Sequence, residues 1–383
     1  MTRFCLIGPT YPYRGGIAHY TTLLAQHLRE EHEVLLLSFS RQYPAWLFPG
    51  KSDKDPSERP LQTEARYELD PLNPLTWWRT LRLIREWQPD MVVIPWWHPY
   101  FALVWTALGR SIRRLSPRPK FIFICHNVRP HEQGRLSKLL LPRILKTVLG
   151  QGDGYIVHSQ ADRAILLEVL PQAQVTVSPL PTYASLGGES ATELPVALPS
   201  DRPLLLFCGL VRPYKGLDVL LEAMALLTRP VHLLIAGEFW QGGRASYQAQ
   251  IERLGLAKCV TIIDDYLPDE LLTACIDRAN VVVLPYRSAT QSAVVQTAFG
   301  RGKPVITTNV GGLGEAVEDG RTGLVVPPED PESLAAAIDH YFAQGLEGIF
   351  SGNVVVGNAR FSWQHLITTI ESMLPQTKGE VAA

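Results

Sequence analysis

Cysteine is scarce in this chain and never occurs in close pairs. The 383 residues include five cysteines, which are dispersed and show no Cys-x-x-Cys spacing. A zinc site or a disulfide framework uses closely or regularly spaced cysteines, so this pattern argues against both. Dispersed thiols in apolar sequence contexts are typical of the reduced interior of a cytosolic protein.

The chain also lacks a long apolar run and a large net charge. No run of about 20 apolar residues is present, so we expect no membrane-spanning helix. Prolines and glycines follow the first short strand at once, a pattern unlike that of a signal peptide. The formal net charge is −1, which gives no overall signature of nucleic-acid binding. We therefore expect a cytoplasmic protein with no nucleic-acid partner.

Apolar residues are abundant, and they recur in a strand-then-helix rhythm. They make up 46% of the chain, whereas charged residues make up 19%, so a sizeable core is available. Residues 3–8 and 32–40 are predicted strands around a predicted helix over 17–32, which indicates a parallel α/β sheet. The rhythm restarts at 202–209 after a Pro-, Ser- and Gly-rich stretch. The length and this restart predict two Rossmann-like domains, 1–180 and 203–357, joined by a linker over 181–202.

The most informative stretch is 285–323, in which polar and glycine-rich turns follow buried strands. Ser292 opens a helical run and is a candidate N-cap, which leaves N–H groups free in the first turn. Gly311 and Gly312 follow the next strand and precede another helix start. Two helix N-termini at the carboxyl edge of one sheet form a usual anion site. Ordinary glycine-closed turns explain the same pattern equally well.

The segment GKPVITTNVGGLGEAVEDGRTGLVVPPEDPESLAAAI is similar to part of the retaining, nucleotide-sugar-dependent glycosyltransferases of family 4. The resemblance covers nearly the whole chain and is strongest from 203 to 366. It implies the GT-B fold, with two Rossmann-like domains facing a cleft and a C-terminal segment, 358–383, crossing back to the first domain. It also implies transfer of a sugar from a nucleoside diphosphate sugar to a glycan or glycolipid hydroxyl with retention. No metal or other cofactor is expected.

Arg212 and Lys215 are the main candidates for chemistry, in the loop CGLVRPYKGLDVLLEA between a strand and a helix. Such cations can hold phosphate oxygens, although a solvated loop is the simpler explanation for isolated charges. The resemblance identifies this loop with the family's phosphate loop, with Leu210 where the family usually has Arg. It also implies that His126, at the end of a predicted strand, contacts the donor sugar. His126, Arg212 and Lys215 are therefore the expected catalytic residues.

The resemblance also implies a set of donor-binding residues and shows one departure. The family's two glutamates, separated by seven residues, correspond to Ala289 and Thr297 here. The chemistry does not require both, because the leaving phosphate is thought to take the acceptor proton. The expected donor-binding residues are Gly15, Gly16, Gln291, Ser292, Gly311, Gly312 and Glu315. The expected ribose and base region comprises Glu238, Tyr266 and Thr297.

Two regions in the first half of the chain each have two possible interpretations. Residues 41–76 are predicted as a long irregular loop, which is either an acceptor loop or a solvated insertion. Arg110, Arg113, Arg114 and Arg118 lie near four aromatic residues, and a second basic stretch alternates with leucines. Either these are solvated surface helices, or they contact a membrane at its inner face. The aromatic residues are Trp96, Trp97, Tyr100 and Trp105, and the second stretch carries Arg135, Lys138, Arg143 and Lys146.

Two other functions fit the same fold. The missing glutamates suit a non-catalytic sugar-nucleotide-binding or partner subunit, which would hold a nucleotide without turnover. A sugar-nucleotide epimerase is a further alternative, although no distinct acid and base set supports it. Fold-level analogy leaves both open. We predict a glycosyltransferase whose partners are a nucleoside diphosphate sugar and a glycan or lipid-linked acceptor.

Overall fold

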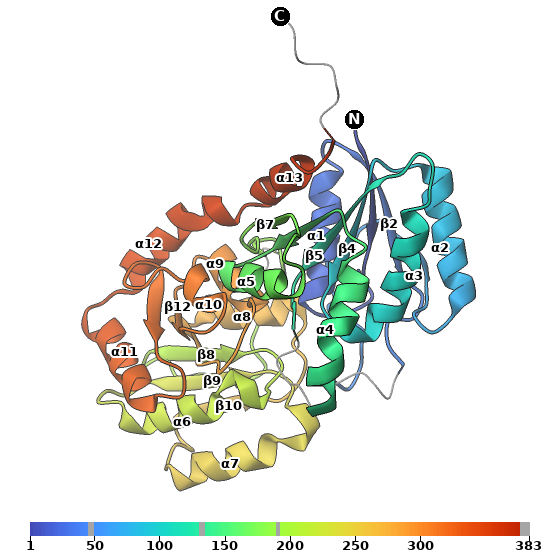
Figure 1. Ribbon diagram of the computed structural model, residues 1–383. Helices are drawn as coiled ribbons and strands as arrows, with labels where there is room; N and C mark the ends of the chain where they lie inside the picture. Colours follow the sequence, from blue (N-terminus) through green and yellow to red (C-terminus); the bar gives the residue numbers. More distant parts are fainter. Residues whose placement is uncertain (45–49, 130–134, 189–191, 376–383) are drawn as a thin grey trace, which may run out of the picture. The chain divides into compact units, whose positions relative to one another are not determined.

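The computed structural model describes residues 1–44, 50–129, 135–188 and 192–375, apart from the side chains of 135–139 and 241. The chain divides into two compact units, shown in sequence colours in Figure 1. Unit 1 comprises Met1–Leu47, Gln62–Pro179 and Trp363–Ala383, and unit 2 comprises Phe48–Leu61 and Leu180–Ser362. The segment predicted as the linker therefore groups with unit 2, and the last helix groups with unit 1.

Unit 1 is built on a seven-stranded parallel sheet in the order β3-β2-β1-β4-β5-β6-β7. Its strands are β1 (Arg3–Ile7), β2 (Glu33–Phe39), β3 (Arg66–Leu69), β4 (Met91–Trp96), β5 (Lys120–Cys125), β6 (Gly154–Val157) and β7 (Val175–Val177). Its helices are α1 (Gly16–Leu28), η1 (Pro99–Phe101), α2 (Pro74–Trp87), α3 (Ala102–Ile112), α4 (Arg135–Leu149), α5 (Gln160–Val169) and α13 (Trp363–Glu371). Strand β3 lies inside the stretch that was predicted as irregular.

Unit 2 is built on a six-stranded parallel sheet in the order β10-β9-β8-β11-β12-β13. Its strands are β8 (Leu204–Cys208), β9 (His232–Ala236), β10 (Val260–Ile263), β11 (Val281–Leu284), β12 (Val305–Thr308) and β13 (Gly323–Val326). Its helices are α6 (Leu217–Leu226), α7 (Arg244–Arg253), α8 (Asp269–Arg278), α9 (Ala293–Gly300), α10 (Leu313–Ala316), α11 (Pro331–Ala343) and α12 (Glu347–Gly357). Its short 3₁₀ turns are η2 (Pro213–Lys215), η3 (Trp240–Gly242) and η4 (Asn358–Phe361).

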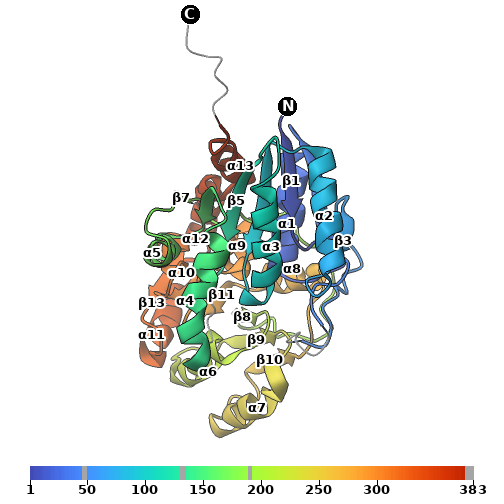
Figure 2. The same ribbon diagram turned by 45° about the vertical axis from the view of Figure 1, so that its right-hand side comes forward.

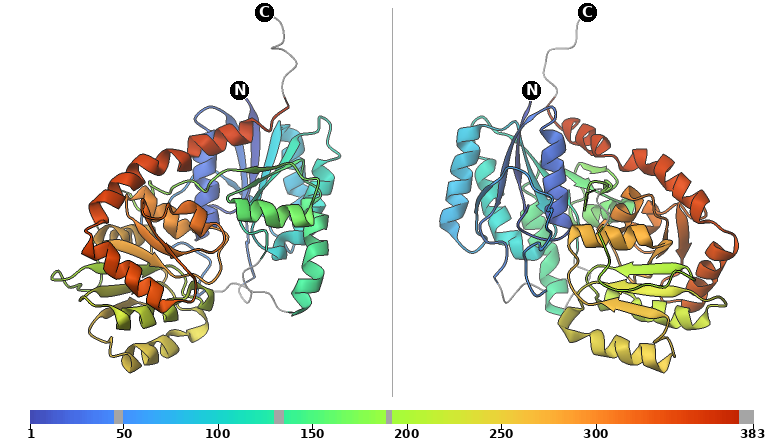
Figure 3. Two further views of the ribbon diagram at one scale, coloured as in Figure 1. Left: turned by 60° about the vertical axis from the view of Figure 1, so that its left-hand side comes forward. Right: turned by 180° about the vertical axis from the view of Figure 1, so that it is seen from behind.

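The central strands of unit 2 are buried on both faces, which explains their continuous apolar sequences. In β8, Leu205 and Phe207 pack into one core layer, whereas Leu204 and Leu206 pack into the other. This alternation follows from the two-residue period of a strand. Helices α6, α7 and α11 cover the first layer, and α8, α9 and α10 cover the second, so the sheet lies between two helical layers (Figure 3).

The last helix packs within unit 1. The Trp363 ring stacks on His27 of α1 at a centroid distance of 5.5 Å and lies 5.3 Å from the Tyr20 ring. At the other end of α13, Glu371 Oε1 lies 2.8 Å from His32 Nε2. The predicted fold class is confirmed, because both units are parallel α/β layers and the last helix belongs with the first. Among the described residues, no helix has the length and apolar character needed to cross a bilayer.

Each sheet has one position at which the chain reverses its direction of winding. In unit 2 the strands run outward from β8 to β10, and then from β11 to β13 on the other side. In unit 1 the reversal lies between β1 and β4. Open α/β sheets bind ligands beyond the carboxyl ends of the strands at such switch points. The topology therefore directs attention to the loops after β8 and β11 and after β1 and β4.

Candidate functional site

The switch point of unit 2 gathers four of the predicted site residues. The loop after β8 carries Arg212 and Lys215, and the loop after β11 carries Gln291 and Ser292. Strands β8 and β11 are hydrogen-bonded neighbours, so both loops leave the same edge of the sheet. These cations and polar groups are therefore close together although they are about 80 residues apart in sequence.

Two glycines in the left-handed region shape the loop after β8. Gly209 has φ +92° and Gly216 has φ +67°, conformations that other residues adopt only with strain. A Cβ at Gly216 would also lie 2.0 Å from Pro285 O, so the loop approaches the strand end closely. Between the glycines, Lys215 N donates to Arg212 O at 2.9 Å and closes the η2 turn. Both cations are thus presented by one tight turn.

Lys215 is a buried cation without an anionic partner. Its side chain is only 8% exposed, and among the described residues it forms no hydrogen bond or ion pair. Its Nζ lies 5.4 Å from the centroid of the Tyr286 ring, and a Cβ on Gly209 would come within 3.1 Å of it. Burial lowers the pKa of Lys215 from 10.5 to about 8, which still leaves it mostly charged at neutral pH. A bound anion would relieve this desolvation.

Arg212 is held by an aromatic surface at the start of the same turn. Its guanidinium lies 4.2 Å from the Trp240 ring centroid and 5.9 Å from that of Tyr214. Stacking on a ring fixes the plane of a guanidinium, and the N–H groups in that plane match planar or tetrahedral oxyanions. The substitution of Leu210 for the family's usual arginine therefore leaves one ordered arginine in this loop.

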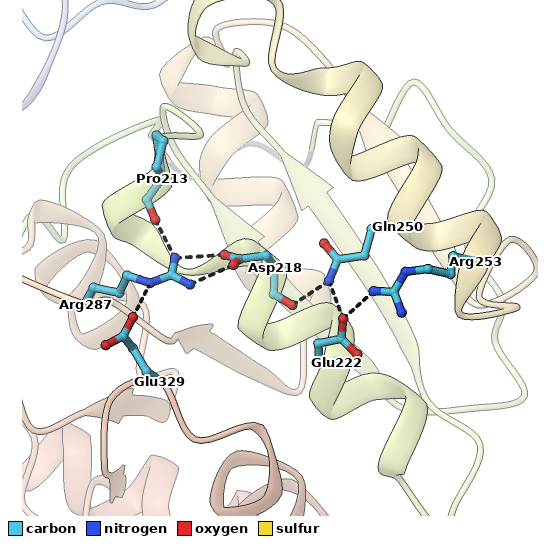
Figure 4. A network of polar contacts seen from close by, with 7 residues as sticks. All are labelled: Pro213, Asp218, Glu222, Gln250, Arg253, Arg287 and Glu329. Atoms are coloured by element: carbon cyan, nitrogen blue, oxygen red, sulfur yellow. Dashed lines mark hydrogen bonds and ion pairs between the residues drawn. The ribbon is translucent and has the colours of Figure 1, made fainter.

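A second arginine, Arg287, joins the two loops (Figure 4). It follows β11, and its guanidinium makes a two-bond ion pair with Asp218 at 2.7 and 2.9 Å. It also donates to Pro213 O at 2.7 Å and to Glu329 Oε1 at 3.0 Å. The same network continues through α6 to Gln250 and Arg253, both of which bind Glu222.

Helix α9 presents an open N-terminus beside the cations. Ser292 is its N-cap, as predicted, with the Oγ accepting from Val295 N at 3.4 Å. The N–H groups of Ala293 and Val294 form no hydrogen bond with any described residue. The side chain of Val294 lies 3.6 Å from the position of a Cβ on Gly209, so this first turn borders Lys215. Cation and helix N-terminus therefore attract the same anion.

The Gly311–Gly312 turn is required by close packing against the loop before α9. A Cβ on Gly311 would lie 1.7 Å from Ala289 O, and a Cβ on Gly312 would lie 1.9 Å from Gln291 Nε2. The N–H of Gly312 donates to Thr290 O at 2.9 Å, so it is not available to a ligand. Helix α10 has only four residues, so the second helix N-terminus that the sequence indicated carries little dipole.

The remaining predicted residues of unit 2 lie around this centre. Glu315 is exposed on α10. Glu238 follows β9 and is buried, with its Oε1 accepting from Lys51 N at 2.6 Å. Tyr266 is half-buried after β10. Thr297 is buried in α9, and its hydroxyl donates to Ala293 O at 2.8 Å, so this hydroxyl is engaged within its own helix.

In unit 1, the predicted glycine pair opens α1 directly after β1. Gly15 is the N-cap with φ +99°, and nothing would lie within 4 Å of a Cβ there. The glycine is therefore required by backbone conformation and not by lack of space. Gly16 is the first residue of the helix. This turn lies at the β1 side of the switch point of unit 1.

His126 lies in a buried aromatic cluster at the carboxyl end of β5. Its ring centroid is 4.5 Å from that of Tyr20 and 5.1 Å from that of His158. Its Nε2 is buried and has no hydrogen-bond partner among the described residues. Burial, with a smaller effect from His158, moves the pKa of His126 well below its usual value, so the ring is neutral at pH 7. Burial likewise lowers the pKa of His158 to about 4.

Sequence reasoning missed three residues that shape this site: Tyr286, Arg287 and Trp240. Tyr286 and Arg287 directly follow the strand β11 and its Pro285, a position from which side chains reach the edge of the sheet. A search of every strand end for charged and aromatic residues would have found them. Trp240 follows β9, and its role depends on the approach of a separate loop, for which the sequence carries no local signal.

Two family models match the chain over adjacent ranges. Residues 15–181 match the glycosyl transferase 4-like domain, and residues 202–344 match the glycosyl transferases group 1. The two ranges together span well over half of the sequence and correspond to the two α/β halves. The chain belongs to the family 4 glycosyltransferases and has the GT-B fold.

Curated relatives agree with this family membership, and solved structures share the fold. The D-inositol 3-phosphate glycosyltransferase of Corynebacterium glutamicum is 31% identical over 228 residues, which cover 56% of this chain and 53% of that relative. The chain thus spans about half the length of the curated relatives it matches. Sucrose-phosphate synthase from Thermosynechococcus elongatus is similar in structure, with TM-score 0.72, 21% identity, and coverage of 97% of this chain and 98% of that one. Anabaena HepE in complex with UDP gives TM-score 0.69 at 18% identity, covering 97% of this chain and 100% of that one.

Proposed function

We propose that this glycosyltransferase moves a hexose from a nucleoside diphosphate sugar to a hydroxyl of a glycan or glycolipid, with retention of the anomeric configuration. The observation that carries the proposal is the unpartnered ammonium of Lys215 beside the open N-terminus of α9 at the switch point of unit 2. An anion with two phosphates suits this arrangement, because the cation and the helix N–H groups can each neutralise one of them.

The residues divide the reaction between leaving-group stabilisation and sugar orientation. As the bond between the anomeric carbon and the phosphate oxygen breaks, negative charge grows on the diphosphate next to Lys215 and Arg212. These groups stabilise that charge without a metal ion. The acceptor oxygen forms the new bond to the anomeric carbon, and its proton passes to the leaving phosphate oxygen. Glu315 and the neutral His126 are proposed to orient the sugar.

The experiment is a binding screen followed by turnover. UDP is tested first, since structural neighbours are complexes of HepE with UDP and with UDP-glucose, and then GDP, ADP, dTDP and CDP. A ligand that binds only the folded chain stabilises it by about 2.7 kcal/mol at a hundredfold excess over Kd. We expect one diphosphate to raise the Tm, and the double variant Arg212→Ala/Lys215→Ala to abolish the rise. No shift with any of the five would contradict the proposal.

A non-catalytic sugar-nucleotide-binding subunit is the second candidate, and a specific observation favours it. The family's two glutamates are replaced by Ala289 and Thr297, and the structure engages the Thr297 hydroxyl within its helix. Donor-dependent release of free nucleotide distinguishes the two functions. A transferase releases nucleotide faster when acceptor glycans are added. A binding subunit shows the same Tm shift with no release.

We also propose peripheral contact with the inner face of a membrane, through the layer formed by α2, α3 and α4 in unit 1 (Figure 2). The described side chains of these helices and of 113–118 include nine exposed bases but a single acid, Glu86, although the whole chain has net charge −1. Leu75, Trp78 and Leu103 are exposed by 69%, 62% and 70% on this layer. The bases are Arg79, Arg82, Arg85, Arg110, Arg113, Arg114, Arg118, Arg143 and Lys146.

This surface corrects the aromatic part of the sequence interpretation. Trp96, Trp97 and Trp105 are buried in the core and are not available to lipid. The side chains of Arg135 and Lys138 lie outside the described residues. Trp78 instead borders a cavity of about 500 Å³ between α2 and α3, lined also by Arg85 and Arg114. Trp78 is exposed, and the neighbouring Arg85 and Arg114 form no ion pair with any described residue, a combination that suits an anionic interface.

Vesicle flotation tests this contact. We expect binding to vesicles of phosphatidylglycerol and phosphatidylcholine, weak binding to phosphatidylcholine alone, and loss in Arg85→Ser/Arg114→Ser. The matched control is Arg244→Ser/Arg253→Ser on α7, where both arginines are ion-paired. Equal binding of both vesicle types, or capture by RNA in place of vesicles, would contradict the membrane assignment.

A further inference from the structure

Arg287 forms an extensive hydrogen-bond network at the edge of the unit 2 sheet. Its guanidinium donates four hydrogen bonds, to Pro213, to both oxygens of Asp218 and to Glu329. Its backbone N–H donates a fifth bond to Tyr214 O at 2.7 Å. An arginine side chain has five N–H donors, so nearly all of its capacity is used within the protein. Arg287 is therefore occupied and cannot itself be a principal phosphate ligand.

The partners of Arg287 surround Lys215. Pro213 and Tyr214 form the η2 turn together with Lys215, and their carbonyls both accept from Arg287. Asp218 lies in the first turn of α6, three residues beyond Lys215. On the other side, the ring of Tyr286, the residue before Arg287, faces the Lys215 ammonium. Arg287 thus holds the backbone of the η2 turn, and the adjacent Tyr286 packs against the ammonium of Lys215.

Glu329 extends the clamp to a third strand end. It follows β13 and has φ +58°, a left-handed conformation that costs a non-glycine residue about 1 kcal/mol. In this conformation its carboxylate reaches Arg287 Nε. The clamp therefore ties together the loops after β8, β11 and β13.

The charges of Arg287, Asp218 and Glu329 show whether the clamp attracts an anion itself or only positions the turn. One positive group, Arg287, is matched by two carboxylates, those of Asp218 and Glu329. Burial opposes ionisation of Asp218, but hydrogen bonds and charge from Arg287 lower its pKa overall, so the carboxylate stays ionised. The cluster has net charge −1, so its field does not attract a diphosphate. Any help it gives to anion binding comes through the position of the turn.

We propose that Arg287 is a positioning residue of the transfer reaction: it clamps the η2 turn so that Lys215 and Arg212 meet the leaving diphosphate. The inference rests on the proposed function and assigns a role to a residue outside the family motif quoted above. Asp218 and Glu329 orient Arg287 and form part of the same clamp. Small displacements of a charge-stabilising group reduce catalysis strongly, which gives such a clamp a purpose beyond stability.

The test compares Arg287→Ala and Asp218→Ala with a matched control. Arg301 forms a similar two-bond pair with Asp277 in the same unit and is buried to a similar degree, so Arg301→Ala reports the loss of an ion pair away from the site. Kd for UDP, or for whichever diphosphate binds, is measured by calorimetry. We expect it to rise about tenfold in Arg287→Ala and to stay within twofold in Arg301→Ala.

In Asp218→Ala, the direction of the change in diphosphate affinity distinguishes the two explanations. A purely electrostatic account predicts tighter diphosphate binding, because the substitution removes a negative charge near the anion. The clamp predicts weaker binding, because Arg287 loses its two-bond partner. Arg287→Lys keeps the charge but not the fork of donors, and we expect it to resemble Arg287→Ala. Tighter binding in Asp218→Ala, or full affinity in Arg287→Lys, would overturn the proposal.

A nucleotide-free readout separates this proposal from the proposed function. The pH dependence of Lys215 acetylation, followed by mass spectrometry, reports its pKa without any ligand. The wild-type midpoint is expected near 8. Release of the turn in Arg287→Ala exposes the ammonium and raises the midpoint by at least one pH unit, with no change in Arg301→Ala. An unchanged midpoint refutes the clamp, whereas a shifted midpoint without diphosphate binding refutes only the proposed function.

Discussion

Lys215 in unit 2 and His126 in unit 1 are both buried titratable residues that follow a strand, and their surroundings differ. In unit 2, Lys215 lies against a single tyrosine ring and keeps a pKa of about 8, so it remains a cation at neutral pH. In unit 1, His126 packs against Tyr20 and His158, and its pKa falls well below the usual value, so it is neutral. Of two similar parallel sheets, that of unit 2 therefore carries a charged group and that of unit 1 an uncharged one.

This difference follows from the loops and not from the sheets. Lys215 stands on a tight turn beside an open helix N-terminus, a place where only an anion completes the local electrostatics. His126 directly follows β5 and contacts Tyr20 of α1, so aromatic rings complete its packing. Folds of this class keep the framework and vary the loops, and chemistry changes with the loops.

The largest expected effect comes from removing the charge in unit 2. Lys215→Met should weaken diphosphate binding at least about a hundredfold, since a buried charge-assisted contact is lost. Its pKa shift from 10.5 to about 8 corresponds to about 3 kcal/mol of burial cost. That cost is fully present at pH 7 and fades as pH rises from about 8 to 10.5, because the unfolded state then binds more protons.

Lys215→Met should therefore be more stable than wild type at pH 7 while binding less. Calorimetry with the diphosphate and thermal unfolding without it measure the two effects. A variant that loses both stability and binding would mean that the ammonium has a structural role. Arg301→Ala serves as the control for general effects on unit 2.

The second-largest effect is expected from the neutral residue of unit 1, His126. His126→Ala should lower the transfer rate at least about tenfold, as expected for a polar group that orients the reacting sugar. Kd for the free diphosphate should stay within twofold, because the substitution lies in the other unit. Steady-state kinetics and calorimetry give the two numbers.

His158→Gln is the matched control, since its ring is tied to Ser178 O at 2.8 Å and shares the same aromatic cluster. If both histidine variants slow transfer equally, packing explains the loss and the assignment to His126 is wrong.

A smaller effect is expected from pH alone. Between pH 7 and pH 9 the protonated fraction of Lys215 falls about tenfold, given its pKa of about 8, and diphosphate affinity should fall with it. His126 does not titrate in this range, so His126→Ala should show the same profile. Lys215→Arg keeps its charge and should flatten the curve. An unchanged affinity across the range in wild type would remove Lys215 from the binding site.

The sequence predicted the elements that carry Lys215 and His126, but not the contacts between loops that surround Lys215. The βα rhythm, the N-cap at Ser292 and the cation loop at Arg212 and Lys215 are local patterns, and the structure confirms them as elements. Strand β3 was missed because the stretch around it is rich in proline and charge. Gly312 was predicted to bind the nucleotide-sugar donor. Its N–H donates to Thr290 O, a contact between loops that local patterns do not encode. Arg287 was missed for the same reason, because its partners come from three separate strand ends.

The smallest effect separates the helix N-terminus from the cation. Ser292→Ala removes the cap of α9, which costs about 1 kcal/mol and lowers the Tm by about 2–4 °C for a unit of this size. The N–H groups of Ala293 and Val294 remain, so the diphosphate should bind only about threefold more weakly, through fraying of the first turn. Calorimetry on Ser292→Ala, Ser292→Thr and the Lys215→Met background tests this. Threonine restores the cap and should restore affinity. If the helix and the lysine hold the same phosphate, the two losses are not additive, whereas additive losses would mean that each holds a separate phosphate.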